Sequence, residues 1–205
     1  MTVAPKLDLK KELKALYNPP KSFGFVDVPP IDFIMIDGKG DPGTSQDYMD
    51  AVGALYGVAY NAKFALKKKG SHPDFAVMPL EGLWWADDMD DFVSGKRANW
   101  KWTAMIAMPD FVTAADIDEA KEAAAKKKDL PGIEKLRFER FHEGPAAQIM
   151  YLGPYAEEAP TIAALHRFIA YAGRQLRGTH HEIYLSDPRR TDPARLKTVI
   201  RQPCN

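Results

Sequence analysis

An internal repeat in the predicted secondary structure constrains the fold of this chain more than any other sequence feature. The segments DFIMIDGKG (32–40) and AAQIMYLGPY (146–155) each place Ile-Met in a predicted strand that ends at a glycine turn. An amphipathic helix and two further strands are predicted after each segment. The sequence therefore predicts an α+β fold with a tandem βαββ repeat, pseudo-twofold symmetry and a ligand groove between the two halves.

The repeat predicts how the chain is divided. A helical arm over residues 1–30 precedes a domain over 31–205, and in that domain a connector helix separates the halves. Pairs of residues typical of helix N-termini mark two of the helices: Thr44 with Asp47, and Thr113 with Asp116. The predicted parts of the domain are a first half at about 31–110, the connector at about 113–130 and a second half at about 135–203.

Composition excludes several classes of protein. The chain has 28 Lys and Arg against 28 Asp and Glu, and this neutral balance argues against a nucleic-acid partner. Cys204 is the only cysteine, so an intrachain disulfide is impossible. No apolar run approaches the ~18 residues of a membrane span, and the charged start has no apolar signal region. We therefore expect a cytoplasmic protein with no membrane partner, either a monomer or a homodimer.

Tryptophans are concentrated in the predicted strands of the first half. Side chains two residues apart in a strand share a face, so Trp100 and Trp102 are expected to point the same way. These rings either pack in the core or form the wall of a pocket for a flat ligand. The four tryptophans of the chain are Trp84, Trp85, Trp100 and Trp102.

Glu182 is a carboxylate in the middle of a predicted strand, HHEIYLSD. Glu182 and Tyr184 should share one face with His180, while His181 and Ile183 share the other. Such a carboxylate is usually an exposed charge at a sheet edge. If it lies among aromatic rings instead, its charge attracts cations, and the rings add ~0.5–2 kcal/mol of cation–π attraction. Without a cation, burial would raise its pKa and suit it to acid–base catalysis.

Other catalytic patterns are weak. The adjacent His180 and His181 point to opposite faces of a strand, so they are not expected to share a metal ion. The segment DGKGDPGTS (37–45) lacks the spacing of a phosphate-binding loop, and no GxSxG nucleophile motif occurs. The sequence therefore predicts neither a metal nor a cofactor.

Four segments resemble one family: VMPLEGLWWADD (77–88), WKWTAMIAMPDF (100–111), EEAPTIAALHRFIAYAG (157–173) and HHEIYLSDPRRTDPARLKTVIRQP (180–203). They are similar to the stand-alone GyrI-like small-molecule-binding proteins, and the resemblance runs from about Leu7 to Pro203. It implies a groove between two βαββ halves that binds flat lipophilic cations around a central glutamate, which Glu182 matches. The sequence has no helix-turn-helix extension, so a free-standing binder is expected rather than a regulator.

The resemblance leaves two main functions open. The first is a multidrug-type binding module whose pocket takes planar hydrophobic, often cationic, molecules. The second is a cofactor-free hydrolase that opens the cyclopropane of DNA-alkylating natural products by adding water, with Glu182 as the base and an assisting tyrosine. Tyr151 is our choice, although Tyr184, Tyr56 and Tyr60 also fit. A non-enzymatic accessory protein is a third alternative. The predicted ligand-binding residues are Glu182, Tyr184, Trp84, Trp100, Trp102, Tyr56, Tyr60 and Tyr151.

Overall fold

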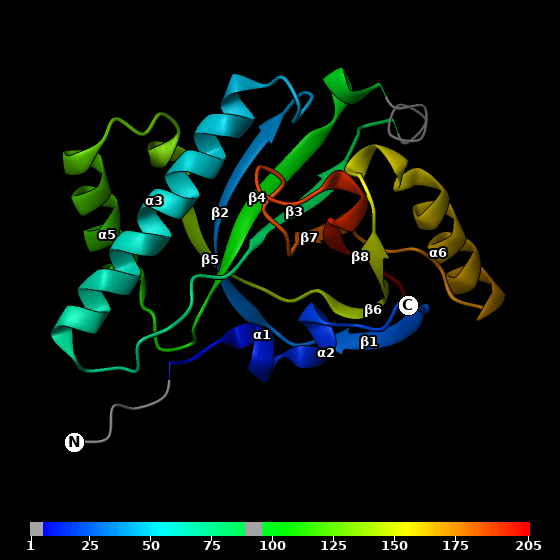
Figure 1. Cartoon of the computed structure of the whole chain (residues 1–205), viewed down its shortest axis with the longest axis horizontal. Helices are drawn as coiled ribbons and strands as arrows, with labels where there is room; N and C mark the ends of the chain where they lie inside the picture. The colour runs from blue at the N-terminus through cyan, green and yellow to red at the C-terminus, as the bar shows by residue number, and fades with distance from the viewer. Residues whose placement is uncertain (1–5, 89–95) are drawn as a thin grey trace. The chain divides into compact units, whose positions relative to one another are not determined.

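The computed structural model describes residues 6–88 and 96–205 (Figure 1). The chain divides into two compact units, each assembled from separate stretches of sequence. Among the described residues, the first unit comprises 6–9, 31–78, 85–88 and 96–141, and the second comprises 10–30, 79–84 and 142–205.

The first unit is an antiparallel sheet with its helices layered upon it. The central strand β2 pairs with β4 on one side and with β5 on the other, so Ile34 lies opposite both Ile106 and Phe138. Helix α3 packs on β2 and β4 through a face of small and aliphatic residues, and α5 packs along α3. The elements are β2 (Ile31–Lys39), α3 (Gln46–Lys69), η1 (Arg97–Asn99), β4 (Lys101–Met108), α5 (Ala114–Lys127), η2 (Ile133–Lys135) and β5 (Arg137–Phe141).

The second unit is a five-stranded antiparallel sheet in the order β1-β6-β8-β7-β3. Helix α6 packs on β6 and β8, where Leu165 and Ile169 meet Ile149 and Ile200 in a buried cluster. The elements are α1 (Leu9–Glu12), which begins in the first unit, α2 (Lys14–Tyr17), β1 (Gly24–Val28), β3 (Leu80–Trp85), whose last residue belongs to the first unit, β6 (Gly144–Leu152), η3 (Tyr155–Glu157), α6 (Ala159–Tyr171), β7 (His180–Tyr184), η4 (Pro193–Arg195) and β8 (Lys197–Pro203).

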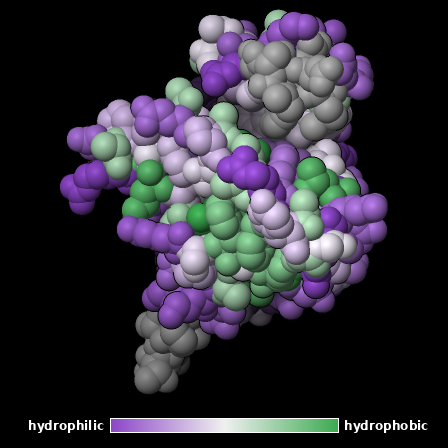
Figure 2. All heavy atoms as spheres, turned by 90° about the vertical axis from the view of Figure 1, so that its right-hand side faces the viewer, coloured by the Kyte–Doolittle hydropathy of each residue, from purple (hydrophilic) through white to green (hydrophobic). Residues whose placement is uncertain are grey.

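The outer side of α6 and β1 is rich in hydrophobic surface. Phe25 and Phe168 lie 4.9 Å apart between ring centroids, and the Arg174 guanidinium lies 4.2 Å from the Phe25 ring. Tyr171 is 89% exposed. Figure 2 faces the side on which α6 lies and shows hydrophobic side chains gathered there. No helix in the described ranges is long and apolar enough to span a membrane.

The structure confirms the predicted α+β class and the order of elements. Strand, helix, strand and strand follow one another as β2–α3–β3–β4 and again as β6–α6–β7–β8. The compact units nevertheless differ from the sequence halves, because β3 of the first half pairs with β7 of the second. The division into an arm, two halves and a connector stays a prediction.

Two local predictions need correction and one is confirmed. Within the predicted arm, the amphipathic pattern of residues 8–17 predicts one short helix, but the helix is interrupted at Leu13, which leaves the short helices α1 and α2. Helix α3 is capped by Ser45, whose hydroxyl accepts from the Tyr48 amide, and not by Thr44. The capping box of Thr113 and Asp116 is present, since each side chain accepts from the backbone amide of the other residue.

A fully buried polar network holds the second unit together. Its centre is His181 on β7, whose Nε2 lies 3.0 Å from Glu81 Oε2 and whose Nδ1 lies 3.0 Å from Glu143 Oε1. Arg201 on β8 donates to Glu143 Oε2 at 3.0 Å, and Tyr17 donates to Glu81 Oε1 at 2.8 Å. Each of these side chains is at most 3% exposed. Buried charges are stable only when paired, and here two cations face two carboxylates.

The same network fixes the N-terminal segment to the sheet. Arg201 Nη2 donates to the Leu16 carbonyl at 2.8 Å, and Gln148 donates to the Ala15 carbonyl at 2.7 Å. These bonds satisfy carbonyl groups at the end of α2 that the short helix leaves without partners. Side chains from β6 and β8 therefore hold α2 against the strands.

Neighbouring charges set the protonation of the network. Burial alone would lower the pKa of His181, but the charge of Glu143 and the hydrogen bonds to Glu143 and Glu81 raise it to about 9. Burial would raise the pKa of Glu143, but the charges of His181 and Arg201 lower it to about 2. Burial and the charge of Glu81 raise the pKa of Tyr17 well above 10, so its hydroxyl stays a donor.

These pKa shifts predict that the free energy of unfolding is highest at moderately acidic pH and falls on either side. His181 contributes stability in full below its ordinary pKa of 6.5, and we expect about 3 kcal/mol to be lost as the pH rises through 9. Glu143 contributes in full above 4.5, and its share is lost as the pH falls toward 2. Urea unfolding across this pH range measures both effects.

Removing one partner provides the control for this prediction. Glu143→Gln removes one of the two carboxylates that balance His181 and Arg201, so it should lower the free energy of unfolding at pH 7 by about 3–5 kcal/mol. It should also make the further loss of this free energy toward pH 9 smaller than in wild type. Glu122→Gln, whose side chain is 76% exposed, should change it by less than about 0.5 kcal/mol. A wild-type stability that does not change between pH 6.5 and 9 would contradict the assignment to His181.

Candidate functional site

The candidate site is centred on Glu182, on the face of β7 opposite to His181. Strand alternation places His180, Glu182 and Tyr184 on this face, as the sequence predicts. Both carboxylate oxygens of Glu182 are engaged: His180 Nε2 lies 3.0 Å from Oε1, and the Tyr184 hydroxyl donates to Oε2 at 2.7 Å. The hydrogen bonds from His180 and Tyr184 outweigh the effect of burial and lower the pKa of Glu182, so it is a carboxylate at neutral pH.

Trp84 extends this chain of hydrogen bonds from the adjacent strand β3. Its indole Nε1 donates to the Tyr184 hydroxyl at 3.0 Å. Gly82, opposite Glu182 in the register, makes room for the ring, because a Cβ there would lie 2.6 Å from the Trp84 Nε1 atom. A larger residue at position 82 would therefore displace the indole that orients Tyr184.

Glu158 brings a second carboxyl group to Glu182. It lies at the start of α6, is 3% exposed, and is close enough to Glu182 for the charge of that carboxylate to act on it. Burial raises the pKa of Glu158 to about 9, and the charge of Glu182 adds to this effect. Thr198 alone would lower the pKa. Two neighbouring carboxyl groups in a buried site cannot both ionise easily, and the raised pKa of Glu158 keeps one proton on that residue at neutral pH.

Aromatic side chains surround the two carboxyl groups. The rings of Tyr155 and Tyr184 meet edge to face, with their centroids 5.4 Å apart. Tyr151, Thr198 and Tyr184 lie opposite one another on the adjacent strands β6, β8 and β7, so they share the face of Glu182. Burial and the charges of Glu158 and Glu157 raise the pKa of Tyr151, which keeps its hydroxyl protonated.

Exposure separates the two carboxyl groups. The Glu182 side chain is 14% exposed, whereas Glu158 is almost fully buried. Glu182 is therefore the member of the pair that solvent or a ligand reaches directly. Its surroundings offer one negative charge, a phenol donor and aromatic ring surface, which are the groups that recognise organic cations.

The remaining predicted site residues belong to the first unit. Trp102 is 1% exposed and packs edge-on against Tyr48, with the ring centroids 5.0 Å apart. Trp100 contacts the guanidinium of Arg97. Tyr56 and Tyr60 follow one another on α3 with ring centroids 6.4 Å apart. Their predicted part in ligand binding stays a prediction.

The structure thus brings four of the predicted residues together and adds others. Glu182, Tyr184, Trp84 and Tyr151 lie on one face of the second sheet. Sequence reasoning missed Glu158, since a glutamate beside the Pro160 of a helix start looks like ordinary surface charge. The sequence placed His180 on the same face as Glu182 but gave it no role in the site, whereas in the structure it is a hydrogen-bond partner of Glu182.

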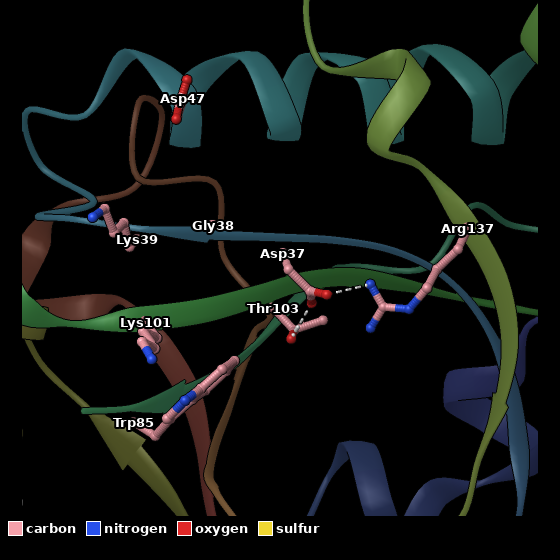
Figure 3. Close-up of a pocket in the computed structure, with 8 residues that line it drawn as sticks. All are labelled: Asp37, Gly38, Lys39, Asp47, Trp85, Lys101, Thr103 and Arg137. Carbon is pink, nitrogen blue, oxygen red and sulfur yellow. Dashed lines mark hydrogen bonds and ion pairs between the residues drawn. The ribbon is translucent and has the colours of Figure 1, made fainter. Parts of the chain in front are cut away.

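A separate pocket of about 520 Å³ lies in the first unit (Figure 3). Asp37 is its most connected group, because it accepts from Thr103 at 2.6 Å and from Arg137 at 2.8 Å. Within the lining, Asp37 forms an ion pair with Arg137, whereas Lys101 pairs with Asp87 and Asp47 pairs with Lys135, and neither of these two partners lines the pocket. The lining residues are Asp37, Gly38, Lys39, Asp47, Trp85, Lys101, Thr103 and Arg137. The described residues also contain no cluster of three or more His, Cys, Asp or Glu suited to a metal ion.

The duplicated βαββ order and the carboxylate among aromatic rings define the class: an α+β small-molecule-binding domain. The model of the GyrI-like small molecule binding domain matches residues 22–203, so the chain belongs to the GyrI-like family. A comparison with curated proteins found no match.

Solved structures agree with this assignment. An uncharacterized conserved protein from Listeria innocua is 40% identical, with 98% of this chain and 100% of that chain covered and a TM-score of 0.89. A hydrolase from the same organism is also 40% identical, with the same coverage and a TM-score of 0.85. The C-terminal domain of EcmrR shares the fold at 14% identity, with 90% and 97% of the chains covered and a TM-score of 0.57.

The hydrogen bond from Tyr184 predicts a change that titration can detect. Tyr184→Phe removes a donor to the Glu182 carboxylate, so the pKa of Glu182 should rise. Carbon-13 NMR of the labelled glutamate side chains measures this pKa. Tyr171→Phe, at an 89% exposed position, is the matched control and should leave it unchanged. An unaltered Glu182 titration in Tyr184→Phe would show that the hydroxyl does not stabilise the carboxylate.

Proposed function

We propose that this GyrI-like protein binds planar hydrophobic organic cations, with Glu182 as their counter-charge. The observation that carries the proposal is an ionised carboxylate, 14% exposed, set among the rings of Tyr184, Trp84 and Tyr155. A partly desolvated negative charge attracts a cation more strongly than a solvated one. The neighbouring rings add cation–π attraction and favour a flat ligand.

Each side chain has a separate part in this proposal. Glu182 supplies the charge, and the Tyr184 hydroxyl holds the carboxylate in one orientation. Trp84 and Tyr151 contribute ring surface on the same face. Trp100, Trp102, Tyr56 and Tyr60 are proposed as further ligand-binding residues on sequence grounds, and the buried Trp102 would have to move to contact a ligand.

A fluorescence titration tests the proposal. Tryptophan emission is followed while wild type and Glu182→Gln are titrated with a planar cationic dye and with a neutral dye of the same shape. Loss of a charge-assisted contact should weaken the cation by about tenfold or more and the neutral dye much less. Glu157→Gln removes an exposed charge from the neighbouring η3 and should behave like wild type. Equal weakening of both dyes by Glu182→Gln would refute the role of its charge.

Hydrolysis of an electrophilic ligand is the second candidate function. One observation favours it: a 40% identical solved structure that spans its whole chain is described as a hydrolase. In this mechanism Glu182 takes a proton from water, and the water oxygen bonds to a cyclopropane carbon as the strained C–C bond breaks. The bond electrons move to the conjugated carbonyl of the substrate, where a tyrosine hydroxyl, that of Tyr151 in our choice, donates a hydrogen bond.

A turnover assay with a cyclopropanoid DNA-alkylating compound distinguishes the two functions. The loss of ultraviolet absorbance measures the rate, and mass spectrometry identifies the hydrated product. If hydrolysis occurs, Glu182→Gln should slow it by roughly 10²–10⁴-fold, the usual contribution of a general base. Tyr151→Phe should lower kcat more than it raises KM, because its hydrogen bond strengthens as charge develops. Wild-type rates in Glu182→Gln would rule out this mechanism and leave binding as the function.

A further inference from the structure

Glu158 has no part in the proposed function, yet its carboxyl group lies against the proposed counter-charge. It is 3% exposed at the start of α6 and lies close enough to Glu182 for the charge of that carboxylate to act on it. Its Oε1 atom is buried and has no hydrogen-bond partner among the described residues. A buried polar atom without a partner is costly, and a positive charge placed beside this oxygen would supply one.

We propose that Glu158 and Glu182 form a two-carboxyl site that keeps one proton when it binds an organic monocation and releases that proton when it binds an organic dication. The proton leaves the Glu158 carboxyl group for water, and no bond of the ligand is made or broken. The inference rests on the proposed function, because Glu182 must first act as the counter-charge.

The charge of the pair follows from its geometry. Hydrogen bonds from His180 and Tyr184 stabilise the ionised form of Glu182, whereas Glu158 is buried and is repelled by that charge. The pKa of Glu158 is therefore about 9, and at pH 7 the pair carries one negative charge. A monocation already neutralises this charge. The second positive charge of a dication, placed beside Glu158, stabilises the ionised form of Glu158, so the carboxyl group loses its proton.

The other titratable groups on the Glu182 face of β7 do not account for a proton that is released between pH 7 and 9. Burial and then the nearby His180 lower the pKa of His166, so it is neutral in this range, and the raised pKa of Tyr151 keeps the phenol protonated. His181 titrates near 9 but faces the other side of β7. The groups that face or flank the pair are Glu157, His166, Tyr151, His180, His181 and Tyr184.

A matched ligand series tests the inference. 4,4′-Bipyridine, its N-methyl cation and its N,N′-dimethyl dication share one scaffold and carry no charge, one charge and two charges. Calorimetric titration of the full chain between pH 6.5 and 8.5 measures their Kd values. We expect the Kd of the dication to fall about tenfold from pH 7 to pH 8, while that of the monocation changes less than about twofold. Titrations in phosphate and Tris count the protons, with about one released by the dication and none by the monocation.

The variants assign the proton. Glu158→Gln should abolish both the pH dependence and the proton release of the dication while the monocation still binds, and Glu157→Gln should retain both. A dication that binds without proton release, or a release that persists in Glu158→Gln, would overturn the inference. If Glu158→Gln does not fold, the wild-type proton count alone decides. If neither cation binds more tightly than neutral bipyridine, the proposed function itself fails, which is a different result.

Discussion

The second unit depends on the ion pairs that His181 forms inside the sheet. His181 lies between Glu81 and Glu143, and Arg201 balances the second carboxylate. This network stabilises the unit and also sets the register of β7. A slip by one residue would exchange the faces of the strand and place the Glu182 carboxylate between Glu81 and Glu143. Three buried carboxylates with one fewer cation would be strongly unfavourable, so the network holds Glu182 on the opposite face.

The two faces of β7 balance charge in different ways. In the network, the cations His181 and Arg201 match two carboxylates, and the balance is complete within the protein. Around Glu182 there are again two carboxyl groups, but a proton on Glu158 takes the place of one cation. One net negative charge therefore remains, and a ligand can supply its partner. The contrast explains why the first face is closed around its charges while Glu182 keeps contact with solvent.

Sequence patterns predicted the features that depend on local chemistry. The βαββ order follows from hydrophobic periodicity and glycine turns, and the capping box of Thr113 and Asp116 follows from their spacing. The faces of β7 follow from strand alternation, which placed Glu182 with Tyr184 and His180. The cap of α3 was harder, since Thr44 and Ser45 are adjacent hydroxyl residues and only the geometry of the turn selects Ser45.

Features that depend on long-range contacts could not be predicted in this way. Glu158 meets Glu182 because α6 packs on the sheet, and nothing in its own surroundings in sequence distinguishes it from the exposed Glu157. The buried network joins Tyr17 and Leu16 to residues beyond position 80, and Arg201 lies 185 positions from Leu16. Trp102 likewise packs against Tyr48, which periodicity alone does not reveal.

The protonation of the carboxyl pair bears on the choice between binding and hydrolysis. A general base works best when its pKa lies near the working pH, and the pKa of Glu182 is lowered by its hydrogen bonds. This state suits a permanent counter-charge better than a strong base. Glu158, with a pKa of about 9, is the group that can donate a proton at neutral pH. A substrate for hydrolysis would therefore meet a weak base, Glu182, beside a buried acid, Glu158. To make Glu182 a stronger base, its hydrogen bond from Tyr184 or His180 would have to break. A cation needs no such rearrangement, and for that reason binding is the function that this geometry supports better.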